Sequence, residues 1–132
     1  MLSAQQNDFF KSVPPNDYFG LFGPEGQPDA QKITDLLRYR RKDVSVASDI
    51  PLNKVRLEPT RIPRELLERV AEWGVALNLV GNFFKDKKKT ILWFQTPNPM
   101  LGNMSPREMI KVGRFKKLLT FIQTALEEGS TE

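Results

Sequence analysis

Apolar residues recur every three or four positions along most of the chain after residue 29, which is the spacing of amphipathic helices. The longest such pattern covers residues 64–84, directly after Pro63, and Pro suits the start of a helix. Its apolar positions form one continuous stripe: Leu66, Val70, Trp73, Leu77, Val80 and Phe84. A second long pattern covers residues 114–128 and has these residues on one side: Phe115, Leu118, Leu119, Ile122 and Leu126. Both segments are predicted to be helices with one buried side.

The shorter segments also favour helices. Asp29 can cap a helix that places Ile33, Leu36 and Leu37 on one face. Short helices are predicted over residues 42–49 and 51–57, and the chain is expected to break at residues 58–60. A charged bend is predicted at residues 85–89, after the long helix. The segment "TILWF" (90–94) is apolar at nearly every position, and the lack of a partner strand favours a helix there. The chain after residue 29 is therefore predicted to be all-α, with about six helices.

Residues 1–29 have a different composition, because Pro and Gly interrupt any regular element. Five aromatic residues nevertheless occur there: Phe9, Phe10, Tyr18, Phe19 and Phe22. Either this arm lies across its own domain or remains mobile, or it is a segment that becomes ordered on a partner. We predict three parts: a flexible arm rich in aromatic residues, Pro and Gly (1–29), a helix-turn-helix-like module (30–60), and a C-terminal helical domain (61–129) joined to the module by the long helix.

The absence of both Cys and His from the 132 residues limits the chemistry that the chain can perform. Disulfides, thiolate zinc sites, His metal ligands and the Ser-His-Asp and Cys-His nucleophile arrangements are all excluded. We therefore expect no enzyme activity, no metal and no cofactor. No apolar run approaches the ~20 residues of a membrane span, and the first residues do not form a signal peptide. The expected location is the cytoplasm, without membrane contact.

The net charge of +4 is unevenly distributed along the chain. Residues 1–29 carry −3, whereas residues 30–64 carry nine Lys or Arg against four acidic residues. A basic segment of this kind indicates an anionic partner such as nucleic acid, although a solvated basic face would have the same composition.

The segment "DVSVASDIPLNKVR" (43–56) has the spacing of a helix-turn-helix, with Asp49 at the turn position that requires a left-handed residue. In a DNA-binding role the second helix would present Leu52, Asn53, Lys54 and Arg56, the polar ones to base edges. Arg38, Arg40, Arg41 and Lys42 would contact phosphates. Operator binding by so small a module would require a homodimer. The alternative is a three-helix core that does not bind DNA.

The turn-rich segment 97–105, here called the corner, joins two apolar stretches. Ser105 and Glu108 form a capping box and Pro106 occupies the first helical position, so a helix is predicted to start there and to end or bend at Gly113. Pro97 and Pro99 restrict the backbone, and Trp93 with Phe94 would anchor the corner to the core. We interpret the corner as structural first and as a binding element second.

The stretch "ILWFQTPNPMLGNMSPREMIKVGRFKKLLTFIQTALEEG" resembles the toxin-binding domain of Xre/MbcA/ParS-type antitoxins. The matching positions are Trp93, Phe94, Pro97, Asn98, Pro99, Leu101, Gly102, Ser105, Pro106 and Ile110. The resemblance extends over residues 30 to 129, with Asn103 in place of a usual Gly and "GRFKKLLTFI" in place of an acidic-Gly-Ala run.

This resemblance implies an antitoxin that binds and blocks a RES-type, NAD-consuming toxin and represses its own operon. It also implies that the C-terminal helical domain (61–129) is the toxin-binding and dimerisation domain. Contacts with the toxin are expected at the corner and on the last helix: Asn98, Met100, Leu101, Arg114, Lys117, Gln123, Glu127 and Glu128. Two alternatives remain open: a stand-alone helix-turn-helix regulator without a toxin, and a helical adaptor whose aromatic arm recruits another protein.

Overall fold

The structure, a computed structural model, describes residues 16–130 and is all-α, as predicted. Six α-helices form in this range: α2 (Ala30–Leu36), α3 (Arg41–Ser48), α4 (Arg64–Phe84), α5 (Lys87–Gln95), α6 (Pro106–Lys111) and α7 (Phe115–Ser130). Two 3₁₀ turns, η1 (Leu52–Lys54) and η2 (Pro99–Leu101), complete the secondary structure. No β-strand occurs between residues 16 and 130.

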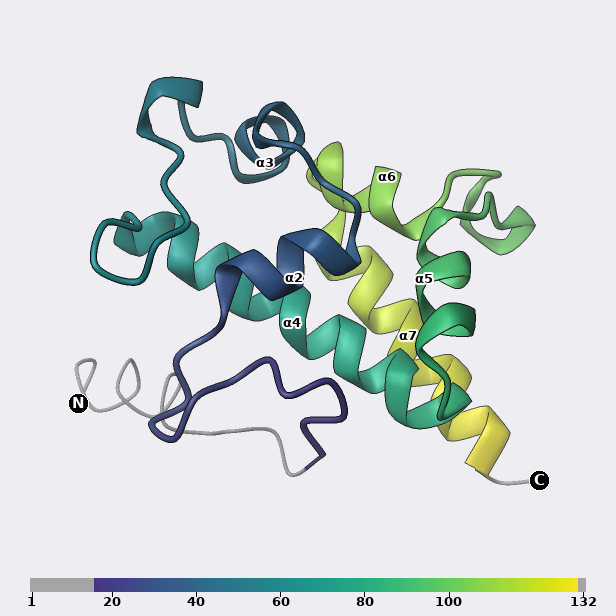
Figure 1. Cartoon of the computed structure of the whole chain (residues 1–132). Coiled ribbons are helices and arrows are strands. Elements are labelled where there is room, and N and C mark those ends of the chain that lie inside the picture. Colours follow the sequence, from purple (N-terminus) through teal and green to yellow (C-terminus); the bar gives the residue numbers. More distant parts are fainter. Residues whose placement is uncertain (1–15, 131–132) are drawn as a thin grey trace, which may run out of the picture.

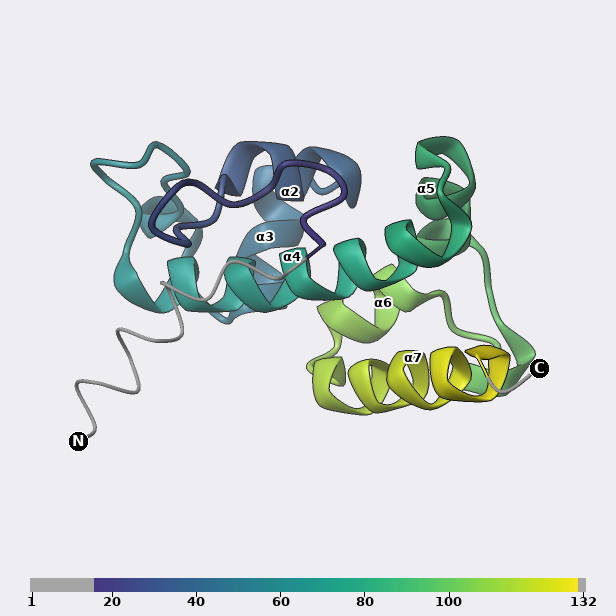
Figure 2. The same ribbon diagram turned by 90° about the horizontal axis from the view of Figure 1, so that it is seen from below.

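The long helix α4 is the centre of the fold. Helix α2 packs against it on one side, α7 lies beside it on another, and α5 turns back from its C-terminal end (Figures 1 and 2). The predicted apolar stripe of α4 is the buried one: Leu66, Val70, Trp73, Leu77 and Val80 are at most 5% exposed, and Phe84 packs against them. Although α4 has 21 residues, neither it nor any other helix of the described range is long and apolar enough to cross a membrane.

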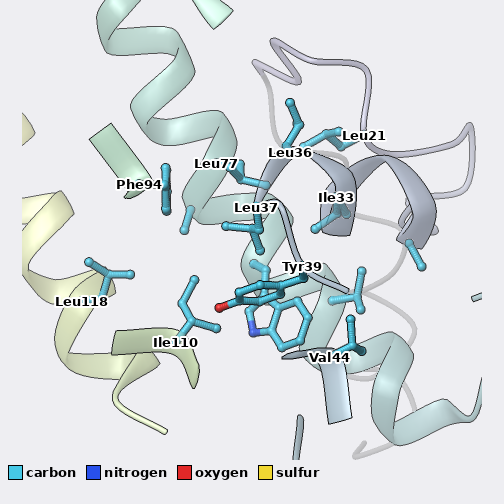
Figure 3. Close-up of a cluster of buried hydrophobic side chains, with 14 of the residues drawn as sticks. Leu21, Ile33, Leu36, Leu37, Tyr39, Val44, Leu77, Phe94, Ile110 and Leu118 are labelled. Atoms are coloured by element: carbon cyan, nitrogen blue, oxygen red, sulfur yellow. The ribbon is translucent and has the colours of Figure 1, made fainter. Parts of the chain in front are cut away.

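One continuous core extends across the predicted module and the predicted C-terminal domain (Figure 3). Tyr39 stacks edge-on against Trp73, with 5.7 Å between the ring centroids. Ile110 of α6 and Leu118 of α7 are both buried on the other side of the same cluster. Burial of each such side chain contributes about 1.5–3 kcal/mol, so the two halves stabilise one another.

The described part of the arm, residues 16–29, packs on α4. Leu21 is fully buried, and the backbone N–H of Phe19 donates to the Asn78 side chain at 3.2 Å. A Cβ atom at Gly81 would lie 2.5 Å from Phe19 Cε2, and one at Gly74 would lie 3.0 Å from the ring of Phe22. These two glycines therefore give the arm's aromatic rings room against the helix. Phe9 and Phe10 lie outside the described residues.

The helix predicted over residues 51–57 is wrong. The left-handed turn forms as expected, with φ 60° at Asp49, but only η1 follows it, and Val55 is already extended. The Arg41 guanidinium donates to the carbonyls of Leu52 (2.9 Å) and Val55 (3.4 Å). A helix over residues 51–57 would use the Leu52 carbonyl as the acceptor for the N–H of Arg56, whereas here it faces Arg41 of α3. The predicted helix-turn-helix therefore has its first helix and its turn but lacks a recognition helix.

The charged bend predicted over residues 85–89 is shorter than expected. Lys85 ends α4 in the left-handed conformation, with φ 54°. The carboxylate of Asp86 then accepts from the backbone N–H of Lys89 at 2.9 Å and caps α5, which begins at Lys87. Lys87, Lys88 and Lys89 thus belong to the first turn of α5.

Candidate protein and nucleic-acid interfaces

The corner is closed by hydrogen bonds that centre on Asn98. Its backbone N–H donates to the Met104 carbonyl at 3.0 Å, and its carbonyl accepts from the N–H groups of Leu101 and Asn103 at 2.9 and 3.0 Å. Its side chain accepts from Met100 N–H at 2.9 Å. Gly102 and Asn103 are both left-handed, with φ 68° and 66°, so Asn replaces the usual Gly without loss of the turn. Asn98, predicted to contact a toxin, is thus half-buried and holds the corner together.

The remaining corner residues divide into anchors and exposed groups. Phe94 is fully buried, while Trp93 and Leu101 are half-buried and pack on the core. Met100 is 77% exposed, and Pro97, Pro99 and Gly102 are also exposed. Apart from the two prolines, Met100 is the apolar side chain of the corner that is most exposed to solvent.

The exit of the corner follows the predicted cap in part. The Ser105 hydroxyl accepts from Glu108 N–H at 3.2 Å, and Pro106 is buried at the first helical position. The reciprocal bond of a full capping box, from Ser105 N–H to the Glu108 carboxylate, does not form among the described contacts. Gly113 ends α6 with φ 81°, as predicted.

Arg107, inside the same motif, ties the corner to the predicted N-terminal module. Its Nε donates to the Leu37 carbonyl and its Nη2 to the Arg38 carbonyl, both at 2.8 Å. Both acceptors lie just beyond the last residue of α2, where carbonyls have no partner within the helix. In return, the Tyr39 hydroxyl donates to the Arg107 carbonyl at 2.6 Å. Arg107 therefore caps α2 from a distance of about seventy residues in sequence.

Asp43 of α3 completes this junction. Lys111 Nζ lies 3.0 Å from its carboxylate and Arg107 Nη2 lies 3.8 Å from it. Burial raises the pKa of Asp43, but the Arg40 N–H bond and the charges of Lys111 and Arg107 together outweigh it and hold the pKa below its usual value. The pKa of the Tyr39 hydroxyl is raised by burial, so it stays a donor. Sequence reasoning missed this junction, because nothing local in "SPRE" identifies its distant acceptors.

The predicted toxin contacts on α7 are all exposed: Arg114, Lys117, Gln123, Glu127 and Glu128. Lys117 and Glu128 are separated by about 16 Å along the helix. Figure 1 shows the corner at the upper right and the last turn of α7 at the lower right. The predicted set therefore does not form one patch, but divides into Met100 on the corner and a long stripe on α7.

A cleft of about 530 Å³ opens at the start of α7. Its walls come from the end of α3, from α4 and from the α6–α7 turn, and its rim carries Arg69, Arg114, Lys116 and Lys117. Trp73, Ile110 and Phe115 contribute apolar surface. Glu72 also lines the cleft, and burial raises the pKa of its carboxyl despite the nearby Arg69 and Lys116. This end of α7 presents cations around an apolar floor.

The predicted DNA-binding residues are separated by their hydrogen bonds into two groups. Arg41 and Arg56 donate to backbone carbonyls of the η1 region and line a cleft of about 540 Å³. Arg40, Lys42, Asn53 and Lys54 are exposed, and Leu52 is 44% exposed. Because η1 is a single turn, it cannot place a series of side chains along a major groove as a recognition helix does.

The described residues thus define an all-helical protein in which a C-terminal helical pair, α6 and α7, packs with a small N-terminal helical unit on one long helix. No family model and no curated protein matches the chain. Among solved structures, the chain is similar to a chain of the crystal structure of the M. tuberculosis MbcT-MbcA toxin-antitoxin complex. The match covers 76% of this chain and 92% of that chain, with a TM-score of 0.51 and 19% identity. The resemblance predicted from the corner motif is confirmed at the level of the fold.

Proposed function

We propose that this protein is an antitoxin that binds a toxin of the RES type and blocks its consumption of NAD. The observation that carries the proposal is the fold shared with a chain of a toxin–antitoxin complex, over most of both chains. The corner motif supports the RES type, because it matches the toxin-binding domain of Xre/MbcA/ParS-type antitoxins. The sequence contains no His and no Cys, which fits a regulator that acts by binding.

The toxin-binding surface that we propose comprises Met100 and the exposed stripe of α7. A protruding Met is a flexible apolar group that adapts to a partner's pocket. Lys117, Gln123 and Glu128 supply polar groups along about three turns of a helix whose other side is anchored by Leu118 and Ile122. A helix fixed in this way loses little conformational entropy when it docks. Asn98 and Leu101 act indirectly in this proposal, since they hold Met100 in place.

We further propose that the protein represses its operon as a homodimer. Arg40, Lys42 and Lys54 are among the exposed cations of the predicted module, and they suit contacts with DNA phosphates. Without a recognition helix, the contribution from base edges is small, so the two modules of a dimer must provide the affinity together.

The test begins with the tagged full chain, purified from its native host under low salt. The expected result is a stoichiometric partner that consumes NAD once separated and is inactive in the complex. Met100→Ser is expected to weaken the complex at least tenfold, because it removes an exposed apolar anchor. Leu92→Ser is the matched control: Leu92 is 63% exposed on α5, outside the proposed surface, and its substitution should leave the affinity unchanged.

Two results would contradict the proposal. A chain that elutes alone, with unaltered NAD turnover when a RES-type toxin from the same host is added, is no antitoxin of this type. Equal affinities for the Met100→Ser and Leu92→Ser variants would exclude the corner from the contact.

A further inference from the structure

A cleft of about 540 Å³ beside the start of α3 contains three arginines: Arg41, Arg56 and Arg61. Arg41 is the first residue of α3, Arg56 follows η1, and Arg61 lies in the loop before α4. Three separate segments therefore contribute an arginine to one cleft. Arg41 and Arg61 are exposed and Arg56 is half-buried, so all three can be reached from solvent.

The positive charge of this cleft is not balanced by the chain itself. Glu58 is the only acidic residue of the lining, so three arginines against one glutamate leave a net charge of +2. Within residues 16–130 none of the three arginines forms an ion pair, whereas Arg107 and Lys111 both lie against Asp43. A cleft in which one sign of charge dominates concentrates the electric field and attracts ions of the opposite sign.

The guanidinium groups of two of these arginines are held in place by the backbone. Arg41 Nη2 donates to the Leu52 carbonyl and Arg56 Nη1 donates to the Asn53 carbonyl, both at 2.9 Å. A guanidinium group has five N–H donors, so each of the two retains donors for a ligand. Because both groups are already fixed, they lose little conformational entropy when an anion binds. The Arg61 side chain has no hydrogen-bond partner within residues 16–130, so it can turn towards the ligand.

The uncharged polar side chains of the cleft are already engaged. The Thr34 hydroxyl donates to a carbonyl of its own helix at 2.9 Å, and the Gln31 amide donates to the Asp35 carboxylate at 3.0 Å. The Tyr39 hydroxyl donates to the Arg107 carbonyl. The arginines are therefore the main side-chain donors that remain for a ligand, and the cleft favours an anion over a neutral polar group.

We propose that this cleft binds a phosphate group. Guanidinium groups bond phosphate oxygens in parallel pairs, an arrangement that the single ammonium group of a lysine does not provide. A terminal phosphate carries about −1.5 to −2 charges at neutral pH, which matches the net +2 of the lining. The source is the terminal phosphate of a small molecule or the backbone phosphate of DNA. In the first case the site goes beyond the proposed function, and in the second it rests on the proposed binding of DNA.

The test is a titration of the full chain with pyrophosphate at constant ionic strength, followed by ¹H–¹⁵N NMR. The backbone amide signals of Val55 and Leu57, which line the cleft, should shift and saturate. Arg61→Gln removes one cation without breaking a side-chain hydrogen bond, and it should weaken the binding of pyrophosphate about tenfold. Arg114→Gln is the matched control, because it removes the same charge from an exposed position outside the cleft, and it should weaken binding by less than about twofold. Arg56→Lys keeps the charge but loses the fork of N–H donors, so its effect should lie between the two.

A second titration, with a DNA duplex of arbitrary sequence, identifies the source of the phosphate. Saturable shifts with pyrophosphate that are sensitive to Arg61→Gln assign the site to a small phosphorylated ligand. Shifts of the same signals with the duplex alone, with the same sensitivity, assign it to the DNA backbone. The proposal is overturned if neither probe shifts the Val55 and Leu57 signals. It is also overturned if Arg61→Gln and Arg114→Gln weaken binding equally, because the attraction is then non-specific. A negative result with both probes leaves the proposed binding of a toxin standing, since no toxin takes part in the titration.

Discussion

Replacing Arg107 by Met should destabilise the protein by about 3 kcal/mol. The substitution keeps an unbranched apolar side chain beside the Tyr39 ring, over which the guanidinium carbon lies at 5.1 Å, but it removes both bonds to the end of α2. A hydrogen bond from a charged group contributes roughly 1.5–3 kcal/mol, and most of that value applies here because the side chain is only 22% exposed. The ion pair with Asp43, at 3.8 Å, adds at most ~1 kcal/mol.

The measurement is urea unfolding at pH 7, followed by tryptophan fluorescence. Trp73 is 1% exposed and stacked on Tyr39, so its emission reports directly on this junction. Arg114→Met is the matched control: Arg114 is exposed, and a substitution there should change stability by no more than about 0.5 kcal/mol. Arg107→Lys should recover less than half of the loss, since one ammonium group does not reproduce the fork of two N–H donors.

Two results would refute the reasoning. If Arg107→Met is as stable as Arg114→Met, the carbonyls at the end of α2 are satisfied without the guanidinium. If Arg107→Lys is as stable as the unmodified protein, the positive charge of Arg107, and not the geometry of its two N–H donors, stabilises the end of α2.

Three further predictions concern other parts of the molecule. The pKa of Asp43 is lowered in the folded state, so its stabilising contribution is fully present above about pH 4, the unfolded pKa, and is lost as the pH falls through the folded pKa. Urea unfolding should therefore show a stability difference between Asp43→Asn and the unmodified chain at pH 7, and this difference should shrink steadily as the pH is lowered below about 4. Gly81→Ala should displace the Phe19 ring and speed amide hydrogen exchange of the arm. In a Phe19→Ala background, the same change should instead stabilise the protein by about 1 kcal/mol, because Ala favours a helix over Gly. If Gly81→Ala stabilises the protein in both backgrounds, the Phe19 ring can shift away from the new methyl group at no cost. Replacing Lys42 and Lys54 by Ala should lower the slope of log affinity against log salt for operator DNA by about 2, and an unchanged slope would remove both from the phosphate contacts.

The sequence predicted those elements whose signals are local. The stripe of α4 repeats at helical spacing, and the caps at Asp29 and Ser105 need only a side chain and an N–H group three residues later. The left-handed positions at Asp49 and Gly113 were also predicted from residue type and spacing. Each of these signals lies within one continuous stretch of the chain, which explains why pattern alone was sufficient.

The predicted helix over residues 51–57 is wrong because a contact with a residue distant in sequence determines the backbone conformation there. Residues 51–57 have apolar spacing that fits a helix, yet Arg41, more than ten residues earlier, draws two of their carbonyls towards α3. The position of the arm could not be predicted from its own sequence, because its aromatic rings pack on α4 at Gly74 and Gly81, where the helix has no side chain. The candidate toxin contacts stay a prediction, and the fold distributes them between Met100 on the corner and the stripe on α7.

The capping of α2 by Arg107 has a consequence for the order of events during synthesis. At translation rates of 5–20 residues per second, residue 107 leaves the peptidyl transferase centre roughly 3–14 s after residue 38. Throughout that interval the nascent chain carries α2 with an uncapped end and without its partners on α6. A message that is cut short, or a ribosome that stalls before the corner, therefore yields a fragment open to proteases rather than a working half. The parts assigned to DNA and to the toxin become competent together, once nearly the whole chain has been made.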